Sequence, residues 1–360
     1  MRVLAVTAHS DLPETKMFIG LKQAGVNLEV MCPDDAPHRQ KLIDGGVDVH
    51  SLKLKGRIDR HGTMEIRKRL VSGQFHILHA FNNKAVSNGL RASKGLEVKF
   101  IAYRGIEANV SVFDPASWTT YLHPRVDKII CVADAIRRYL VNMKFLWWRF
   151  PADKAITIHK GHDLGWYQAP AVPRSEFGIP QDAFVVGCTA NERPRKGLPY
   201  LIEAAKLLPR DAAIHFLLIG QIGSSKTMRS IAASPFRNRI HLTGFRQDAP
   251  QVLASCNACI LPALKREGLP KAIIEGMVYA VTPIVTNSGG SPELIEDGKS
   301  GLIIPPGSSR AIADAILQLY EDRAACMQMG VEAQQRIQRD FHTSKTIEQT
   351  LSVYRELWSG

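Results

Sequence analysis

Two glutamates, Glu267 and Glu275, stand eight positions apart in the stretch KREGLPKAIIEGMVYA. Between them, Gly268, Leu269 and Pro270 form a turn that opens a predicted helix, because proline suits the first helical position, where its missing N–H would be unpaired anyway. The free amides of such a first turn and the helix dipole favour a phosphate or another polar oxygen. Carboxylates accept hydrogen bonds that hydroxyl groups donate. The stretch therefore predicts a site for a phosphorylated, hydroxyl-rich ligand, the alternative being an exposed glutamate pair on a surface helix.

Two further loops carry groups that suit the same ligand. Upstream, the loop NERPRKG follows an apolar, strand-like run and holds Arg193, Arg195 and Lys196. Such cations can neutralise a diphosphate. Downstream, VTNSGGSPELIEDG places Gly289 and Gly290 after another strand-like run, where their backbone amides could hold phosphate. Each loop alone could be a solvated turn, but three of them in this order indicate one composite site.

Apolar runs alternate with amphipathic stretches along the whole chain, and these elements must position the loops. In the first half the predicted strands are RVLAVTA, LEVMCP, FHILHAF, KFIAYRG, KIICVA and KAITIHKG, with helices that include residues 15–24 and 64–72. In the second half they are FVVGCTA, IHFLLIG, IHLTGF, ACILPAL, VTPIVTN and GLIIPP, with helices GLPYLIEAAKLL, KAIIEGMVYA and SRAIADAILQLYED. Strand–helix alternation predicts parallel sheets covered by helices on both faces. We therefore expect an α/β fold of two doubly wound, Rossmann-like domains whose strand-end loops face a cleft.

The length of 360 residues is too great for one ordinary core, which also favours two domains. A proline-rich stretch, QAPAVPRSEFGIPQ, indicates the linker. We predict an N-terminal domain at 1–168, a linker at 169–182, a second domain at 183–340, and a final helix at 341–360 that packs back toward the first domain. Leu351, Tyr354 and Leu357 would form the packing face of that helix.

The composition, with 45% hydrophobic and 22% charged residues, is typical of a globular protein. No apolar run approaches the roughly 20 residues that cross a bilayer, and the first run is too short for a secretory signal. The six cysteines, with Cys256 and Cys259 in a CxxC, are expected to be buried thiols rather than disulfide partners or zinc ligands. We therefore expect a cytoplasmic protein. Residues 1–168 carry 25 Lys and Arg against 16 acids, and residues 169–360 carry 21 against 18, so the first half is expected to meet an anionic partner.

Gly244 and Phe245, followed by ILPALKREGLPKAIIEGMVYAVTPIVTNSGGSPELIEDGKSGLIIPP, resemble the donor domain of the glycosyltransferase family 4 enzymes, which are retaining enzymes with the GT-B fold. The resemblance covers about residues 183–335. It rests on the glutamate pair, the Gly-Gly-Ser-Pro-Glu run and the Asp-Gly-Lys-Ser-Gly run. It implies that Glu267 contacts the transferred sugar, that Glu275 contacts the nucleotide ribose, and that Lys196 with a neighbouring Arg binds the diphosphate. The donor-binding residues that it implies are Glu275, Gly268, Leu269, Pro270, Lys271, Gly244, Phe245, Arg195, Asn191, Gly289 and Gly290, with Gly244 and Phe245 beside the base. Such enzymes usually need no metal cofactor, and the chain has no Asp-x-Asp cluster suited to a divalent cation.

Two positions depart from the family pattern. Asn191 stands where an arginine commonly precedes the Lys-Gly pair, so Arg193 or Arg195 would replace that cation. Arg104 stands where many members have a histidine, and it could bind an anionic sugar, stabilise the leaving diphosphate or be a structural, salt-bridged residue. His79, at another predicted strand end, fits either a core or a cleft residue. The catalytic residues predicted in this way are Glu267, Lys196, Arg193 and Arg104.

Two segments of the first half are candidates for the acceptor side. Residues 53–70 carry eight Lys, Arg or His side chains against two acids, which indicates either a solvated helix face or a surface for a phosphorylated acceptor or an anionic lipid. Residues 144–150, KFLWWRF, place aromatic side chains between two cations, which suits a membrane interface or packing against the domain core. Basic groups with stackable rings also suit nucleic acid, but the donor-domain pattern makes this the weakest option. The residues predicted for this side are Lys53, Lys55, Arg57, Arg60, Trp147 and Trp148.

The sequence thus predicts a retaining glycosyltransferase that moves a sugar from a UDP- or GDP-sugar to a glycan or glycolipid acceptor. Its resemblance suggests lipopolysaccharide or surface-polysaccharide synthesis, with peripheral contact at the inner, anionic face of the cytoplasmic membrane and no nucleic-acid partner. The alternatives are a nucleotide-sugar epimerase on the same fold and a non-catalytic scaffold that retains the domains.

Overall fold

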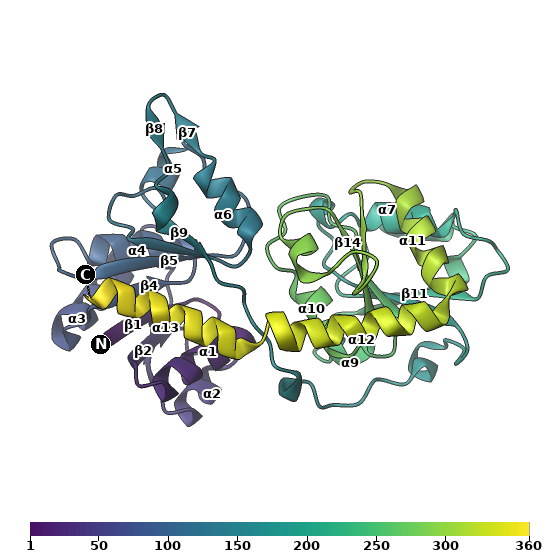
Figure 1. Cartoon of the computed structure of the whole chain (residues 1–360), viewed down its shortest axis with the longest axis horizontal. Coiled ribbons are helices and arrows are strands. Elements are labelled where there is room, and N and C mark those ends of the chain that lie inside the picture. The colour runs from purple at the N-terminus through teal and green to yellow at the C-terminus, as the bar shows by residue number, and fades with distance from the viewer. Residues whose placement is uncertain (360) are drawn as a thin grey trace. The chain divides into compact units, whose positions relative to one another are not determined.

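The computed structural model describes residues 1–359, and its chain divides into two compact units (Figure 1). Unit 1 comprises Met1–Gly161 and the segment from Phe341 onward, and unit 2 comprises His162–Asp340. The division lies at Gly161, whereas the sequence predicted residue 168. Residues 162–168 group with unit 2 because the Tyr167 ring packs on Tyr279, with centroids 6.2 Å apart.

Unit 1 contains a seven-stranded parallel sheet with the order β3-β2-β1-β4-β5-β6-β9. Its strands are β1 (Arg2–Val6), β2 (Asn27–Cys32), β3 (Asp48–Ser51), β4 (Ile77–Ala80), β5 (Lys99–Arg104), β6 (Lys128–Cys131) and β9 (Ala155–Thr157). Its helices are α1 (Leu12–Gln23), α2 (Arg39–Asp44), α3 (Arg60–Gly73), α4 (Asn83–Ala92), α5 (Pro115–Trp118), α6 (Asp134–Val141) and α13 (Thr343–Ser359). The connections run outward in both directions from the β1–β4 pair, so right-handed crossovers place α1 and α2 on one face and α3 and α4 on the other.

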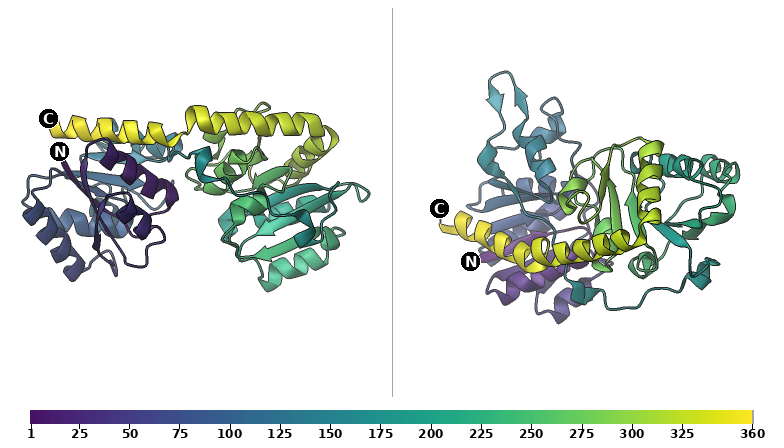
Figure 2. Two further views of the ribbon diagram at one scale, coloured as in Figure 1. Left: turned by 90° about the horizontal axis from the view of Figure 1, so that it is seen from below. Right: turned by 45° about the vertical axis from the view of Figure 1, so that its right-hand side comes forward.

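The last helix of the chain completes the core of unit 1. Helix α13 lies along α1, as Figure 2 shows in its left view. Tyr354 is fully buried, while Leu351 and Leu357 are partly buried against the same apolar cluster as Phe18 and Leu28. The predicted packing face of this helix is therefore confirmed.

Unit 2 contains a six-stranded parallel sheet with the order β12-β11-β10-β13-β14-β15. Its strands are β10 (Phe184–Thr189), β11 (Ile214–Ile219), β12 (Ile240–Gly244), β13 (Ala258–Leu261), β14 (Thr282–Thr286) and β15 (Leu302–Ile304). Its helices are α7 (Leu198–Ala205), α8 (Ser225–Ala232), α9 (Ala249–Leu253), α10 (Lys271–Val278), α11 (Ser309–Glu321) and α12 (Arg323–Asp340). The strand order reverses between β10 and β13, and ligands of such sheets bind at the carboxyl ends of strands beside a reversal of this kind.

Each apolar run that was expected to form a strand contains one, so the predicted α/β class with two Rossmann-like sheets is confirmed. The sequence missed the half-exposed edge strand β3, whose residues DVHS form no apolar run. It also missed a two-stranded hairpin, β7 (Lys144–Phe145) and β8 (Trp148–Arg149).

All six cysteines are buried and free, as predicted. Burial raises the pKa of the Cys188 thiol to about 12, so that thiol is unreactive at neutral pH. Among the helices of residues 1–359, none combines the length and the apolar character needed to span a bilayer.

Candidate functional site

The loop after β10 is held in place by a close backbone contact. Residues Pro194–Lys196 form a short 3-10 helix, and Gly197 follows with φ +71°. A Cβ atom at Gly197 would lie 1.8 Å from the carbonyl oxygen of Pro262, so only glycine fits this position. The amide of Leu264 donates to the carbonyl of Arg195 at 2.8 Å. The loops after β10 and β13 are therefore fixed to each other.

Glu267 lies between two cations from the β10 loop. Its side chain is 5% exposed. Arg195 Nη1 donates to one carboxylate oxygen at 2.9 Å, and Lys196 Nζ lies 3.0 and 3.1 Å from the two oxygens. These three side chains together carry one net positive charge. This remaining positive charge can attract an anion beside Glu267.

The backbone around Glu267 is shaped by two left-handed residues. Arg266 has φ +66°, a conformation that costs a non-glycine residue about 1–2 kcal/mol. Gly289, in the loop after β14, has φ +57°, and its Cβ would lie 2.1 Å from the carbonyl oxygen of Glu267. The amide of Gly290 donates to that same carbonyl at 3.2 Å. Strain of this kind persists where surrounding contacts over-determine a site.

Helix α10 begins at Lys271. Pro270 is therefore its N-cap residue, whereas the sequence predicted that Pro270 would be the first helical residue. No side chain caps this helix, so its first amides are available for an oxygen ligand. Glu275 is 6% exposed, and Lys271 Nζ lies 2.8 Å from its carboxylate. Gly268 is buried and Leu269 is partly buried in the turn that leads from Glu267 to the helix.

Two buried hydroxyl groups near the Gly289–Gly290 turn have no hydrogen-bond partner within residues 1–359. They belong to Ser288 and Ser291. Buried polar atoms are nearly always paired in native proteins, so unpaired hydroxyls beside an uncapped helix indicate a place for a polar ligand.

A pocket of about 480 Å³ opens beside Lys196. Its lining residues are Thr189, Ala190, Asn191, Lys196, Ile219, Gly220, Gln221, Phe245, Arg246 and Ala249. Phe245 is 71% exposed, and the amide of Gly220 donates to the carbonyl of Gly244 at 2.9 Å. The hydroxyl of Thr189 is buried and has no partner in the described part of the chain. The pocket thus combines an exposed aromatic ring with polar groups, which suits a heterocyclic base or a sugar.

The sequence prediction missed Glu192, which connects two of the pocket-forming loops. Its carboxylate accepts hydrogen bonds from the amides of Gly223 and Ser224 at 2.9 and 2.8 Å, and from the hydroxyls of Ser224 and Thr227. The Ser224 and Thr227 hydroxyls lower the pKa of this carboxyl group to about 2. The signal available in the sequence was the SSKT start of α8, which offers hydroxyls and free amides to a carboxylate.

The structure distinguishes the two arginines of the NERPRKG loop. Arg195 contacts Glu267, whereas Arg193 is exposed at the start of the 3-10 helix. Asn191 is exposed and lines the pocket. The pocket also includes Arg246, which the sequence did not single out and which Asp248 and Glu176 already pair.

Within unit 1, Arg104 ends strand β5 and is 3% exposed. Its guanidinium donates to Asn83 Oδ1 at 3.2 Å and lies 4.6 Å from the centre of the Tyr121 ring. It forms no salt bridge with any carboxylate of residues 1–359, and its Nη2 atom has no partner there. The salt-bridged alternative is therefore wrong, and Arg104 is a buried cation without a counter-charge.

His79 is a core residue. It is 1% exposed, and its Nδ1 atom lies 2.7 Å from the hydroxyl of Tyr354. Burial lowers its pKa to about 3, so the ring is neutral at physiological pH. Of the basic residues before and at the start of α3, Lys53 pairs with Asp35, while Lys55, Arg57 and Arg60 are exposed.

The two tryptophans of KFLWWRF have different environments. Trp147 is 89% exposed at the end of the β7–β8 hairpin. Trp148 is half-buried and packs edge-to-face on Trp118, with ring centroids 4.9 Å apart. The core-packing interpretation therefore holds for Trp148, while the membrane interface stays a prediction for the exposed Trp147.

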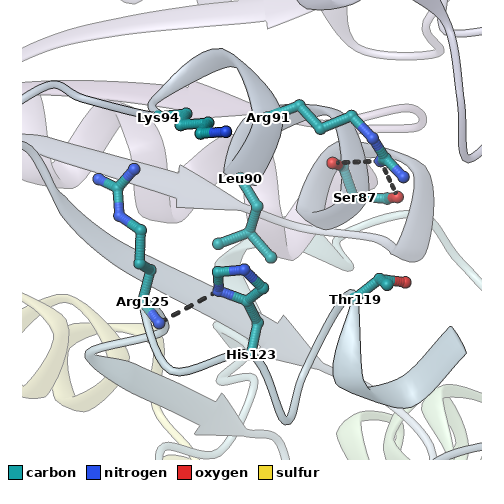
Figure 3. A pocket seen from close by; sticks show the side chains of 7 residues that line it. All are labelled: Ser87, Leu90, Arg91, Lys94, Thr119, His123 and Arg125. Carbon is teal, nitrogen blue, oxygen red and sulfur yellow. Dashed lines mark hydrogen bonds between the residues drawn. The ribbon is translucent and has the colours of Figure 1, made fainter. Parts of the chain in front are cut away.

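Unit 1 also has a basic pocket of about 320 Å³ that the sequence did not predict (Figure 3). Arg91, Lys94, His123 and Arg125 surround Leu90, and Figure 3 shows the guanidinium of Arg91 bonded to Ser87. The Arg125 guanidinium donates to the carbonyls of Ser93 and Leu96. The pocket residues precede strands β5 and β6 in the sequence, so the pocket lies at the amino ends of these strands. Arg104 lies at the opposite, carboxyl end of β5. None of the residues predicted for the site lines it.

Nowhere in residues 1–359 do three or more His, Cys, Asp or Glu side chains gather as a metal ion would require.

Two parallel sheets of this topology, with an acidic and cationic site at the strand reversal of the second, define a GT-B fold. Comparison with known proteins agrees. Residues 183–322 match the family model described as glycosyl transferases group 1. The predicted resemblance to glycosyltransferases is therefore confirmed.

Two curated relatives each align with about half of the chain. The chain is 28% identical over 183 residues to the putative glycosyltransferase EpsD of Bacillus subtilis, covering 50% of this chain and 48% of that protein. It is 24% identical over 214 residues to the UDP-Gal:alpha-D-GlcNAc-diphosphoundecaprenol alpha-1,3-galactosyltransferase of Escherichia coli, covering 57% and 54%. The chain thus spans about half the length of these relatives.

Solved structures share the fold over the whole chain. HepE of Anabaena, crystallised with UDP and glucose, has a TM-score of 0.81 at 18% identity, covering 99% of this chain and 100% of that one. A glycosyltransferase of Rickettsia africae has a TM-score of 0.82 at 17% identity, covering 99% and 98%.

Proposed function

We propose that this protein transfers a sugar, with retention of configuration, from a UDP- or GDP-sugar to a glycan or glycolipid acceptor. The observation that carries the proposal is the contact of Lys196 and Arg195 with Glu267 at the strand reversal of unit 2, next to the uncapped start of α10. Similarity to a galactosyltransferase that acts on a diphosphoundecaprenol-linked sugar, and to structures with bound UDP, supports a nucleotide-sugar donor and a surface-polysaccharide pathway.

In this proposal the diphosphate binds between the cations and the free amides. Lys196 and Arg195 supply positive charge, and the first turn of α10 with the Gly289–Gly290 turn supplies N–H donors. Glu267 accepts hydroxyls of the transferred sugar, and Glu275 accepts those of the ribose. The base would occupy the pocket beside Gly244 and Phe245.

The chemistry proposed for the site is stabilisation of the leaving diphosphate. Negative charge builds on the diphosphate oxygens in the transition state. Preorganised cations and amides stabilise the transition state more than the ground state, because they interact most strongly with that added charge. Glu267 is buried and engaged by two cations, which disfavours it as a nucleophile. We therefore propose that the acceptor hydroxyl attacks the anomeric carbon from the face that the diphosphate leaves, without a metal ion. The bond from that carbon to the diphosphate breaks, and the hydroxyl proton passes to the departing phosphate oxygen.

Unit 1 is proposed to bind the acceptor. Arg104 is a buried cation that lacks a counter-charge, so an anionic group on the donor sugar or the acceptor would satisfy it. The exposed cations Lys55, Arg57 and Arg60 favour an acidic acceptor or lipid surface, which fits peripheral association with the inner face of the cytoplasmic membrane. We propose no nucleic-acid partner.

A thermal-shift screen with nucleoside diphosphates and their sugars tests the proposal, because a ligand that binds only the native state raises its melting temperature. We expect stabilisation by UDP or GDP compounds in the presence of EDTA. Transfer to membrane-extracted glycolipid, followed by linkage analysis, then tests retention. A donor epimerised without acceptor would favour the epimerase alternative, and failure to bind either nucleotide would favour the scaffold.

A further inference from the structure

The hairpin β7–β8 is the most exposed apolar feature of unit 1. Leu146 is 73% exposed and Trp147 is 89% exposed at its end. Phe145 lies beside them, and its ring packs edge-to-face on Phe113, which is itself 78% exposed. Single exposed apolar residues are ordinary on soluble proteins, but four gathered at one tip are not.

The hairpin projects from the unit. Figure 1 shows β7 and β8 at the end of an extension that stands away from the seven-stranded sheet, and the right view of Figure 2 shows the same from a second direction. One side of the hairpin is anchored, because Trp148 packs on Trp118, and the adjoining Phe150 is 5% exposed. An anchored hairpin that carries apolar side chains at its turn is suited to insert into the apolar part of a bilayer.

Two cations lie side by side just behind the tip. Lys144 and Arg149 are paired across the hairpin, as are Phe145 and Trp148 one step further out. Both cations are exposed, and neither forms a salt bridge with a carboxylate of the residues that the structure describes. The order along the hairpin axis is therefore two cations followed by apolar side chains, which matches the order of lipid phosphates and acyl chains at a membrane surface.

The turn itself is not built for stability. Leu146 has φ +52°, the left-handed conformation that hairpin turns normally give to glycine or asparagine. A bulky side chain is uncommon in that conformation, and this one is presented to solvent at the turn.

From these four observations we infer that the β7–β8 hairpin inserts its tip, Leu146 and Trp147 with Phe113 and Phe145, into the interfacial region of a bilayer that carries anionic lipids. Lys144 and Arg149 contact the lipid phosphates. This names the element and the mode of the membrane contact that the proposed function assumes, but lipid binding can be measured without donor or acceptor.

The test is co-sedimentation of the full chain with vesicles of phosphatidylcholine, alone or with about one third phosphatidylglycerol. We expect the wild-type protein to bind the anionic vesicles. Replacing the tip by Leu146→Asn together with Trp147→Ser should lower the partition coefficient at least about tenfold. Asparagine accepts the left-handed turn, so this variant should keep the wild-type melting temperature. Lys144→Gln with Arg149→Gln should lower binding to anionic vesicles by about tenfold or more and leave binding to neutral vesicles unchanged.

Trp358→Ser is the matched control, because Trp358 is 54% exposed on α13 of the same unit; it should bind like the wild type. Tryptophan emission should shift to the blue on vesicle binding and be quenched by lipids brominated in the acyl chains, and Trp147→Phe should lose most of that shift while still binding. The inference is overturned if the wild type binds neither kind of vesicle or if the tip variant binds like the wild type. It is also overturned if Trp358→Ser loses as much vesicle binding as the tip variant does. It is also overturned if the tip variant instead dissolves a dimer seen by ultracentrifugation, since the hairpin would then contact a second copy.

Discussion

Among single residues, Glu267 is the one on which the charge of the proposed donor site depends. Without it, Arg195 and Lys196 would be two unpaired cations in a partly buried loop. With it, the cluster keeps one positive charge, enough to attract a diphosphate and yet compatible with a folded apo state.

The first prediction concerns Lys196. Lys196→Ala removes the net positive charge but leaves Glu267 paired with Arg195. We expect turnover to fall by about 10²–10³-fold, because one preorganised contact to the leaving group is lost, while the melting temperature stays close to that of the wild type. Steady-state kinetics and calorimetry check this. Lys226→Ala, an exposed lysine on α8, is the control and should behave like the wild type. Wild-type rates for Lys196→Ala would remove that residue from the mechanism.

The second prediction concerns Glu192. Its hydrogen bonds hold the β10 loop against the start of α8, so Glu192→Gln should raise the KM for donor about fivefold to tenfold with little change in kcat.

The folded pKa of about 2 lies below the ordinary value, so the ionised carboxylate of Glu192 stabilises the fold at neutral pH and loses this effect as the pH falls toward 2. The melting temperature of the variant should therefore be lower than that of the wild type at pH 7, with a smaller gap at pH 4. An equal gap at both values would contradict the assignment.

At the scale of elements, the loops after β10, β13 and β14 form one site because two glycines let their backbones touch. Gly197 contacts the carbonyl of Pro262, and Gly289 contacts that of Glu267. These contacts bring groups from three loops to the carboxyl ends of neighbouring strands, where a strand reversal leaves room for a ligand.

The third prediction uses a pair of glycines. Gly289→Ala and Gly298→Ala both place alanine at positive φ, but only at Gly289 would the new Cβ meet backbone, 2.1 Å away, whereas nothing lies within 4 Å at Gly298. Both variants should lose about 1–2 kcal/mol of unfolding free energy from backbone strain, and Gly289→Ala should lose more because its Cβ also meets backbone. Only Gly289→Ala should also weaken nucleotide binding, because Glu267 must move. Denaturant unfolding and calorimetry separate the two effects, and equal nucleotide affinity in both variants would refute this role of Gly289.

At the scale of the whole molecule, the end of the chain stabilises its beginning. Helix α13 packs on α1, and Tyr354 reaches His79 beneath them. The same buried region contains Glu14, which is 7% exposed, accepts from Thr7 Oγ1 at 2.6 Å and lies 3.9 Å from Lys160 Nζ.

The fourth prediction concerns the pH dependence of stability. Burial raises the pKa of Glu14 to about 7, and Lys160 offsets this only in part. Because the folded pKa lies above the unfolded one, the protonated form stabilises the fold below about pH 4.5, and this contribution is lost as the pH rises through 7. Glu14→Gln keeps the acceptor for Thr7 and removes the charge. It should match the wild type below about pH 4 and exceed it by about 3 kcal/mol at pH 8–9. Urea unfolding at the two pH values checks this, and a variant less stable at pH 8 would show that the Lys160 attraction dominates.

The elements of this protein were largely readable from local patterns. Apolar runs located the strands, since a strand buried on both faces has no polar alternation to obscure it. Helix starts were less accurate: α1 begins at Leu12 and α3 at Arg60, before the predicted residues 15 and 64, because Asp11 and Asp59 cap them. The hairpin β7–β8 was missed because its turn lacks the glycine or asparagine that marks such turns.

The sequence by itself determined the α/β class, the strand-end loops with anion-binding groups and the glutamate pair, because these depend on periodicity and spacing within about 20 residues. Only the tertiary structure decided that Arg195 rather than Arg193 contacts Glu267, that Glu192 joins two loops, and that Trp147 is exposed while Trp148 is packed. The first two arrangements join residues more than 30 positions apart, and the third depends on which face of a hairpin meets the core. Contacts of that kind are fixed when strands pair in a particular order, and no local pattern encodes that order.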